Sequence, residues 1–135
     1  VRDIVDKSDF CLEQGAVEAN LDNLIEKSDI ISLHVPLTDL TRQMVNADFL
    51  QRMKSTAFIV NTCRGEVVDQ EALKDALSQK IIAGAALDVF VEEPPSDADF
   101  LSLPNLMVTP HIGGNTRESV QAMGRSAINH LVAFF

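Results

Sequence analysis

Four short apolar runs alternate along this chain with helical segments that are apolar on one side. The runs cover residues 30–35, 55–61, 84–88 and 105–109. Their length and their aliphatic, β-branched content are typical of buried strands. Strands that alternate with helices build a parallel sheet, because a right-handed crossover through a helix returns the chain in the same direction. The sequence therefore predicts an α/β fold, a doubly wound parallel sheet with a helical layer on each face.

The segments between these runs carry helix-start residues and apolar stripes. Asn20 and Asp69 are predicted N-caps, and either Asn115 or Thr116 is predicted to cap the last helix. The predicted helices span residues 21–27, 47–54, 70–79 and 117–135. In the last of them the apolar residues recur every three or four positions. They are Val120, Met123, Ala127, Leu131 and Phe134.

Three other stretches give weaker patterns. Residues 1–15 have helical character without a clear stripe, and residues 16–19 are predicted to form a short strand. Residues 92–103 are acidic and contain prolines, and we predict a loop with no element of its own.

The composition excludes several classes of protein. A net charge of −9 argues against a nucleic-acid surface. The sequence contains no apolar run long enough to span a membrane and does not open on a signal peptide, so we expect a cytoplasmic protein. Cys11 and Cys63 are too few for a disulfide framework. The three histidines lack the spacing of metal ligands, so no metal site is predicted.

Polar residues follow each of the four apolar runs. These are His34 and Pro36, residues 61–64, Asp88, and residues 109–114. Because the carboxyl ends of parallel strands meet at one edge of a sheet, we expect one shared site there. The glycine pair at 113 and 114 is predicted to let the backbone approach a ligand closely.

The residue types at these ends form a plausible reaction set. The Arg64 guanidinium matches a carboxylate in two parallel hydrogen bonds, and Gly65 is expected to leave room beside it. His111 suits proton transfer near neutral pH. Glu93 is predicted to orient the imidazole, with Glu92 as the competing candidate. A surface ion pair for the arginine and ordinary loop positions for both acids are the structural alternatives.

The ordered motifs resemble the family of D-isomer-specific 2-hydroxyacid dehydrogenases. The matching segments are SDIISLHVPLTDLTRQMVN, FIVNTCRGEVVDQEAL, AGAALDVFVEEPP and PNLMVTPHIGGNT. The resemblance implies a Rossmann-like fold and hydride transfer between NAD(H) and a small 2-hydroxy or 2-oxo acid, with NADP as an open alternative. It also implies a homodimer for the complete enzyme. Side chains do not carry hydrides, which is why the nicotinamide is needed.

Carried over position by position, the resemblance implies roles for individual residues. Arg64 would bind the substrate carboxylate, and Glu93 would pair with His111 as the general acid/base. Asp88 has two readings, a hydrogen bond to the nicotinamide carboxamide or a cap on the following turn. The implied cofactor-binding positions are Val35, Pro36, Asn46, Thr62, Cys63, Arg64, Asp88, His111, Gly113 and Gly114.

The sequence departs from the family in two features of the cofactor-binding half. It contains no G-x-G-x-x-G loop and no acidic residue placed to read the adenine ribose. We therefore expect a fragment, with residues 1–116 as the later part of the NAD-binding domain and residues 117–135 as a helix that crosses toward a substrate domain. Such a fragment is predicted to be inactive alone. The alternative function is an NAD(H)-sensing, corepressor-like interaction protein on the same scaffold.

Overall fold

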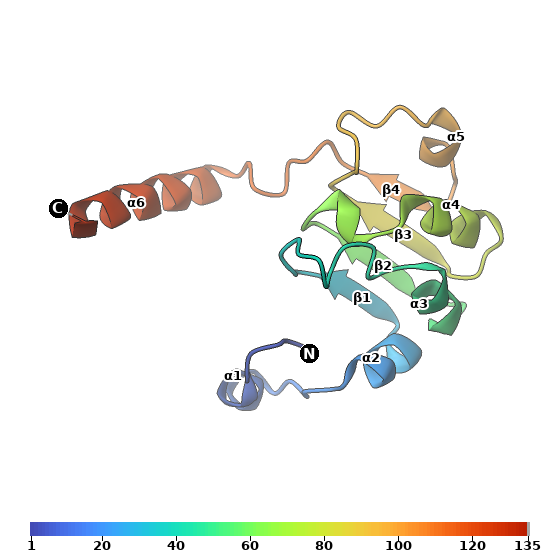
Figure 1. The fold of residues 1–135 in the computed structure, drawn as a ribbon, viewed down its shortest axis with the longest axis horizontal. Coiled ribbons are helices and arrows are strands. Elements are labelled where there is room, and N and C mark those ends of the chain that lie inside the picture. The colour runs from blue at the N-terminus through green and yellow to red at the C-terminus, as the bar shows by residue number, and fades with distance from the viewer. Residues whose placement is uncertain (135) are drawn as a thin grey trace.

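A computed structural model describes residues 1–134, and it contains one parallel four-stranded sheet in the order β1-β2-β3-β4 (Figure 1). The predicted parallel α/β sheet is therefore confirmed. Its elements are α1 (Ser8–Gln14), α2 (Leu21–Lys27), β1 (Ile30–Leu33), α3 (Ala47–Arg52), β2 (Phe58–Asn61), the 3₁₀ helix η1 (Gly65–Val67), α4 (Gln70–Ser78), β3 (Gly84–Leu87), α5 (Ala98–Leu101), β4 (Leu106–Val108) and α6 (Arg117–Phe134).

All four strands end in one register row. Leu33 of β1 is paired with Asn61 of β2, Asn61 with Leu87 of β3, and Leu87 with Val108 of β4. The residues that follow this row therefore leave the sheet side by side along a single edge. That edge gathers the polar residues at the four strand ends.

Side-chain caps fix where the helices begin. The carboxamide oxygens of Asn20 and Asn46 accept hydrogen bonds from backbone N–H groups in the first turns of α2 and α3, and the Asp69 carboxylate does the same for α4. At α6, the Thr116 hydroxyl accepts from the backbone N–H of Ser119. The predicted caps at positions 20, 69 and 116 are confirmed.

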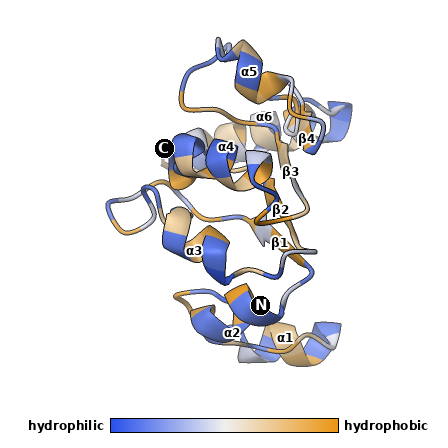
Figure 2. Cartoon of the chain, turned by 90° about the vertical axis from the view of Figure 1, so that its right-hand side faces the viewer, coloured by the Kyte–Doolittle hydropathy of each residue, from blue (hydrophilic) through white to orange (hydrophobic). Residues whose placement is uncertain are grey.

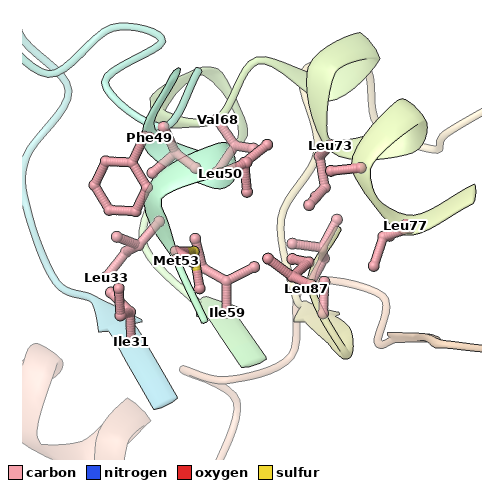
Figure 3. Packing of buried hydrophobic residues seen from close by; sticks show 14 of the residues in the cluster. Ile31, Leu33, Phe49, Leu50, Met53, Ile59, Val68, Leu73, Leu77 and Leu87 are labelled. Carbon is pink, nitrogen blue, oxygen red and sulfur yellow. The ribbon is translucent and has the colours of Figure 1, made fainter. Parts of the chain in front are cut away.

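The core lies on one face of the sheet, between the strands and the helices α3 and α4 (Figure 3). Ile31 and Ile59 point from the strands toward Leu50 of α3 and Leu73 of α4, and each of these side chains is buried. The strands are largely hydrophobic along their length, as the colours of Figure 2 show. Of the two predicted helical layers, the described residues supply the layer formed by α3 and α4.

The opposite face of the sheet carries exposed apolar side chains. Ile30, Phe58 and Met107 are 64%, 48% and 66% exposed, respectively. The expectation of a buried strand at 105–109 is therefore wrong in this structure. β4 is the edge strand, and its side chains at Met107 and Val108 are exposed because neither side of that strand is fully covered.

Two other stretches differ from the sequence-based expectation. Residues 16–19 do not form a strand of the sheet. They pair instead with the N-terminal residue, through two hydrogen bonds between this segment and Val1. Residues 92–103 contain α5, which was not expected. The Asp97 carboxylate accepts from the N–H of Phe100 at 3.0 Å and lies 2.6 Å from the Lys74 ammonium, while the Phe100 ring is fully buried.

Helix α6 projects away from the sheet (Figure 1), and its described residues are partly or fully exposed. The predicted apolar stripe faces solvent, with Val120, Met123 and Leu131 between 54% and 61% exposed. None of the helices among residues 1–134 combines the length and the hydrophobicity needed to cross a bilayer.

Candidate active site

His111 stands just beyond β4, in a turn that Pro110 begins. Its backbone adopts a left-handed conformation with φ of 53°, and its N–H donates to the carbonyl of Thr109. The imidazole Nδ1 lies 2.8 Å from Oε2 of Glu93, and the two side chains are 50% and 38% exposed. Because an ionised carboxylate only accepts hydrogen bonds, Nδ1 carries the proton in this pair. The other ring nitrogen, Nε2, has no hydrogen-bond partner among residues 1–134 and is therefore the one that a ligand can reach.

Glu93 is fixed by a second hydrogen bond, since its Oε1 accepts from the backbone N–H of Phe90 at 3.0 Å. The hydrogen bond with His111, followed by that from Phe90, holds the pKa of the Glu93 carboxyl below its usual range. Glu92 instead accepts from the hydroxyl of Ser96 at 3.3 Å. The geometry therefore selects Glu93 over Glu92 as the partner of the imidazole.

Asp88 anchors the turn that carries His111. Its Oδ1 accepts from the hydroxyl of Thr109 and from the N–H of Ile112 at 2.9 Å, and its Oδ2 accepts from the N–H of Gly113 at 2.8 Å. The side chain is buried, which by itself raises the pKa, but these three hydrogen bonds outweigh the burial and leave the pKa of Asp88 below its usual value. Asp88 therefore holds the turn after β4 and not, as one sequence-based interpretation proposed, the turn that follows it along the chain.

The same carboxylate leaves little room for a side chain at position 113, where the sequence has glycine. A Cβ at position 113 would lie 3.0 Å from Oδ2 of Asp88, whereas a Cβ at Gly114 would meet nothing within 4 Å. The sequence-based argument expects open space beside both glycines; the structure leaves it beside Gly114, whereas Asp88 occupies the space beside Gly113.

The Arg64 side chain is exposed at the end of β2. Its Nη1 donates to the carbonyl of Cys63 at 2.6 Å, within its own turn. The surface ion pair considered for it from the sequence is not among the ion pairs of residues 1–134.

The expectation that Gly65 leaves room for a ligand is wrong. A Cβ at Gly65 would lie 2.0 Å from the carbonyl carbon of Phe90, so the backbone of the loop after β3 fills that space. This close packing joins the turn of Arg64 to the loop whose Phe90 N–H holds Glu93. The turn that carries Arg64 and the loop that carries Glu93 are therefore packed against each other, while the Arg64 side chain itself is exposed.

Arg64 and His111 leave the sheet from strands that are separated by β3 alone. Neighbouring strands lie about 4.8 Å apart, so the two strand ends are roughly 10 Å apart. Both side chains are exposed at this edge of the sheet.

An apolar pocket of about 470 Å³ lies against His111 and Glu93. Its other lining residues are Phe90, Pro94, Pro95, Leu101, Val108, Thr109 and Pro110. A larger hollow of about 600 Å³ lies beside β1, at Val17, Asn20 and Lys27, and contains no comparable acid–base pair.

The remaining predicted cofactor positions lie along the same edge. Val35 is half-buried and Pro36 and Thr62 are exposed, while Cys63 is half-buried. Asn46 is exposed, and its carboxamide oxygen is used to cap α3.

Sequence reasoning missed the part played by Asn61. This side chain is 1% exposed and makes three hydrogen bonds within the turn of Arg64. The pattern that marks it is an asparagine in the last position of a buried strand, directly before a turn, since asparagine commonly bonds to nearby backbone.

The residues present fit the nicotinamide half of a dinucleotide. The buried Asp88 carboxylate retains a lone pair on Oδ2 for an amide N–H, and Gly114 leaves its surroundings open. The pyrophosphate half has no glycine-rich loop in these 135 residues.

A parallel sheet with a histidine–carboxylate pair and an arginine along its carboxyl edge defines a class of dehydrogenase-like α/β domains. Residues 3–113 match the family described as D-isomer specific 2-hydroxyacid dehydrogenase, NAD binding domain. The chain belongs to this family.

Similar proteins cover almost the whole chain. A glyoxylate reductase from Korarchaeum cryptofilum is 45% identical over 98% of the chain, and a glycerate dehydrogenase from Methylorubrum extorquens is 42% identical over 90%. Among solved structures, a D-lactate dehydrogenase from Aquifex aeolicus, complexed with NAD and lactic acid, has a TM-score of 0.85 at 34% identity over 98% of the chain. The chain spans 40%, 39% and 44% of these three proteins, respectively.

Proposed function

We propose that this chain is the catalytic part of the cofactor domain of an NAD-dependent dehydrogenase that interconverts a small 2-oxo acid and its 2-hydroxy acid. The observation that carries the proposal is the 2.8 Å hydrogen bond between His111 and Glu93 at the carboxyl edge of the sheet, two strands from Arg64. The names of the similar proteins support it, since they include glyoxylate reductase, glycerate dehydrogenase and D-lactate dehydrogenase.

Each residue of this set has a distinct task in the proposed reaction. Arg64 releases its contact with Cys63 and binds the substrate carboxylate through its guanidinium fork. His111, through Nε2, gives a proton to the 2-oxo oxygen during reduction and takes one from the hydroxyl during oxidation. Glu93 holds Nδ1 and stabilises the imidazolium whenever the ring carries two protons.

Asp88, Gly113 and Gly114 are the residues that would hold the nicotinamide end of the dinucleotide. When bound, this group supplies or accepts the hydride at the carbon that bears the substrate oxygen. Val35, Pro36 and Asn46 would lie toward its other half. Residues 117–134 are proposed to lead toward the substrate-binding part of the complete protein.

The test is steady-state kinetics of the complete gene product with NADH and glyoxylate or hydroxypyruvate. General acid–base catalysis contributes about 10²- to 10⁴-fold, so His111→Ala should lower kcat by that factor. His130→Ala is the matched control, because His130 is an exposed histidine on α6, away from the site. Equal turnover of the two variants would contradict the proposal. NADH binding without turnover in the wild type would favour the sensing, corepressor-like function.

A further inference from the structure

We infer that Asn61 is a positioning residue that fixes Arg64 for binding the substrate carboxylate. This inference rests on the proposed function and assigns a role to a residue that makes no contact with substrate itself. Arg64 lies on a short turn between β2 and η1. Because its side chain is exposed and packs against little else, the position of the guanidinium depends on how firmly the backbone of this turn is held.

The contacts of Asn61 are directed at that backbone. Its Nδ2 donates to the carbonyl oxygen of Arg64 at 2.9 Å. Its Oδ1 accepts from the N–H of Cys63 and from the Cys63 thiol, both at 3.1 Å. The side chain thus bonds to the backbone on both sides of the Cys63–Arg64 peptide and holds it as a clamp.

The carbonyl of Arg64 also accepts a hydrogen bond from the N–H of Val67, and this is the first hydrogen bond of η1. Asn61 and Val67 therefore fix this carbonyl from opposite ends of the turn. Because Asn61 is 1% exposed, water cannot take the place of its side chain. Removing that side chain would leave the carbonyl of Arg64 with one hydrogen-bond partner and the turn freer to move.

The chain contains a second asparagine that makes the same type of hydrogen bond at the other end of the sheet. Nδ2 of Asn105 donates to the carbonyl of Leu77 at 3.1 Å. Asn105 directly precedes β4, on the edge opposite to Arg64 and His111. A purely structural role for Asn61 predicts that both asparagines behave alike when they are removed, which makes Asn105 the matched control.

The experiment compares Asn61→Ala, Asn61→Ser and Asn105→Ala in the complete gene product, with NADH and glyoxylate as substrates. Misplacing a binding group by about 1 Å costs up to ~10²-fold, and the intact strand limits the displacement here, so the KM for glyoxylate should rise about tenfold in the Asn61 variants. The KM for NADH and the kcat should change less than about threefold, because His111 and Glu93 are held by other contacts. Asn105→Ala should leave both KM values unchanged while lowering the melting temperature to a similar extent.

An unchanged KM for glyoxylate in a folded Asn61 variant would overturn the inference, as would equal increases of both KM values. Failure of Asn61→Ala and Asn61→Ser to fold would also overturn it, since Asn61 would then serve the core alone. Absence of turnover in the wild type with every 2-oxo acid would instead refute the proposed function, and this inference with it. The two failures are therefore distinguished by the wild-type activity.

Discussion

Gly65→Ala is the substitution whose effect this structure defines most sharply. An added Cβ would lie 2.0 Å from the carbonyl carbon of Phe90, 2.2 Å from its oxygen and 2.4 Å from the nitrogen of Val91. Real Cβ atoms essentially never approach other atoms closer than 3.0 Å. The loop after β3 would therefore have to move by about 1 Å, and its backbone cannot rotate away as a flexible side chain can.

Overpacking a buried site costs about 1–3 kcal/mol, occasionally more. Gly65 and Phe90 are both buried and all three close contacts are with backbone atoms, so we expect a loss of about 3 kcal/mol in the free energy of unfolding. For a domain of this size that corresponds to a fall in melting temperature of roughly 10 °C. Turnover should fall as well, because the displaced loop carries Glu93.

The assay is urea unfolding followed by far-UV circular dichroism, since these 135 residues contain neither Trp nor Tyr. Gly124→Ala is the control, because Gly124 lies within α6 and a Cβ there would meet nothing within 4 Å. Alanine is the better helix former, so this variant should be as stable as the wild type or up to ~1 kcal/mol more stable. A Gly65→Ala protein within ~0.5 kcal/mol of the wild type would refute the close packing of the two loops.

Three further predictions concern acidic side chains. Because the pKa of Asp88 lies below its ordinary value of 3.8, the stability that the carboxylate contributes is present above pH 3.8 and is lost as the pH falls through the folded-state pKa, a loss that urea midpoints between pH 7 and pH 2 should show. Asp88→Asn should lower the free energy of unfolding by about 2 kcal/mol at pH 7, and its urea midpoint should depend less on pH in the acid range. Glu93→Gln should reduce kcat by about 10- to 100-fold, whereas Glu92→Gln should leave it unchanged, and similar kcat values would contradict the selection of Glu93. Asp97→Ala removes the cap of α5 and should cost about 1 kcal/mol in a urea titration; no change would show that the buried ring of Phe100 holds the helix without its cap.

Local chemistry made several elements predictable. Asn20 and Asp69 start their helices because a carboxamide or carboxylate oxygen satisfies a free N–H of the first turn, which depends on residues only three apart. Helix α5 obeys the same rule through Asp97, but it has only four residues and one buried side chain, too few for an apolar stripe to appear in the sequence.

Strand lengths were less predictable than strand positions. The apolar runs contain five to seven residues, yet the paired strands have three or four. Hydrophobicity decides which segments enter the sheet, whereas the neighbouring strands decide how far the ladder of hydrogen bonds extends. The exposure of β4 follows from its place at the edge of the sheet, which its own residues do not encode.

By itself, the sequence determined the order of the four paired strands and of the helices α2, α3, α4 and α6, the parallel sheet and the edge at which the polar residues gather. These follow from the periodicity of apolar side chains and from the rule that parallel strands end on one side. Only the tertiary structure decided which atoms meet there. It paired the imidazole of His111 with Glu93, used Asp88 to hold the turn that carries His111, and filled the space beside Gly65 with the backbone of Phe90. Such contacts join residues 18 to 25 positions apart, so they depend on how the loops pack and not on any local pattern.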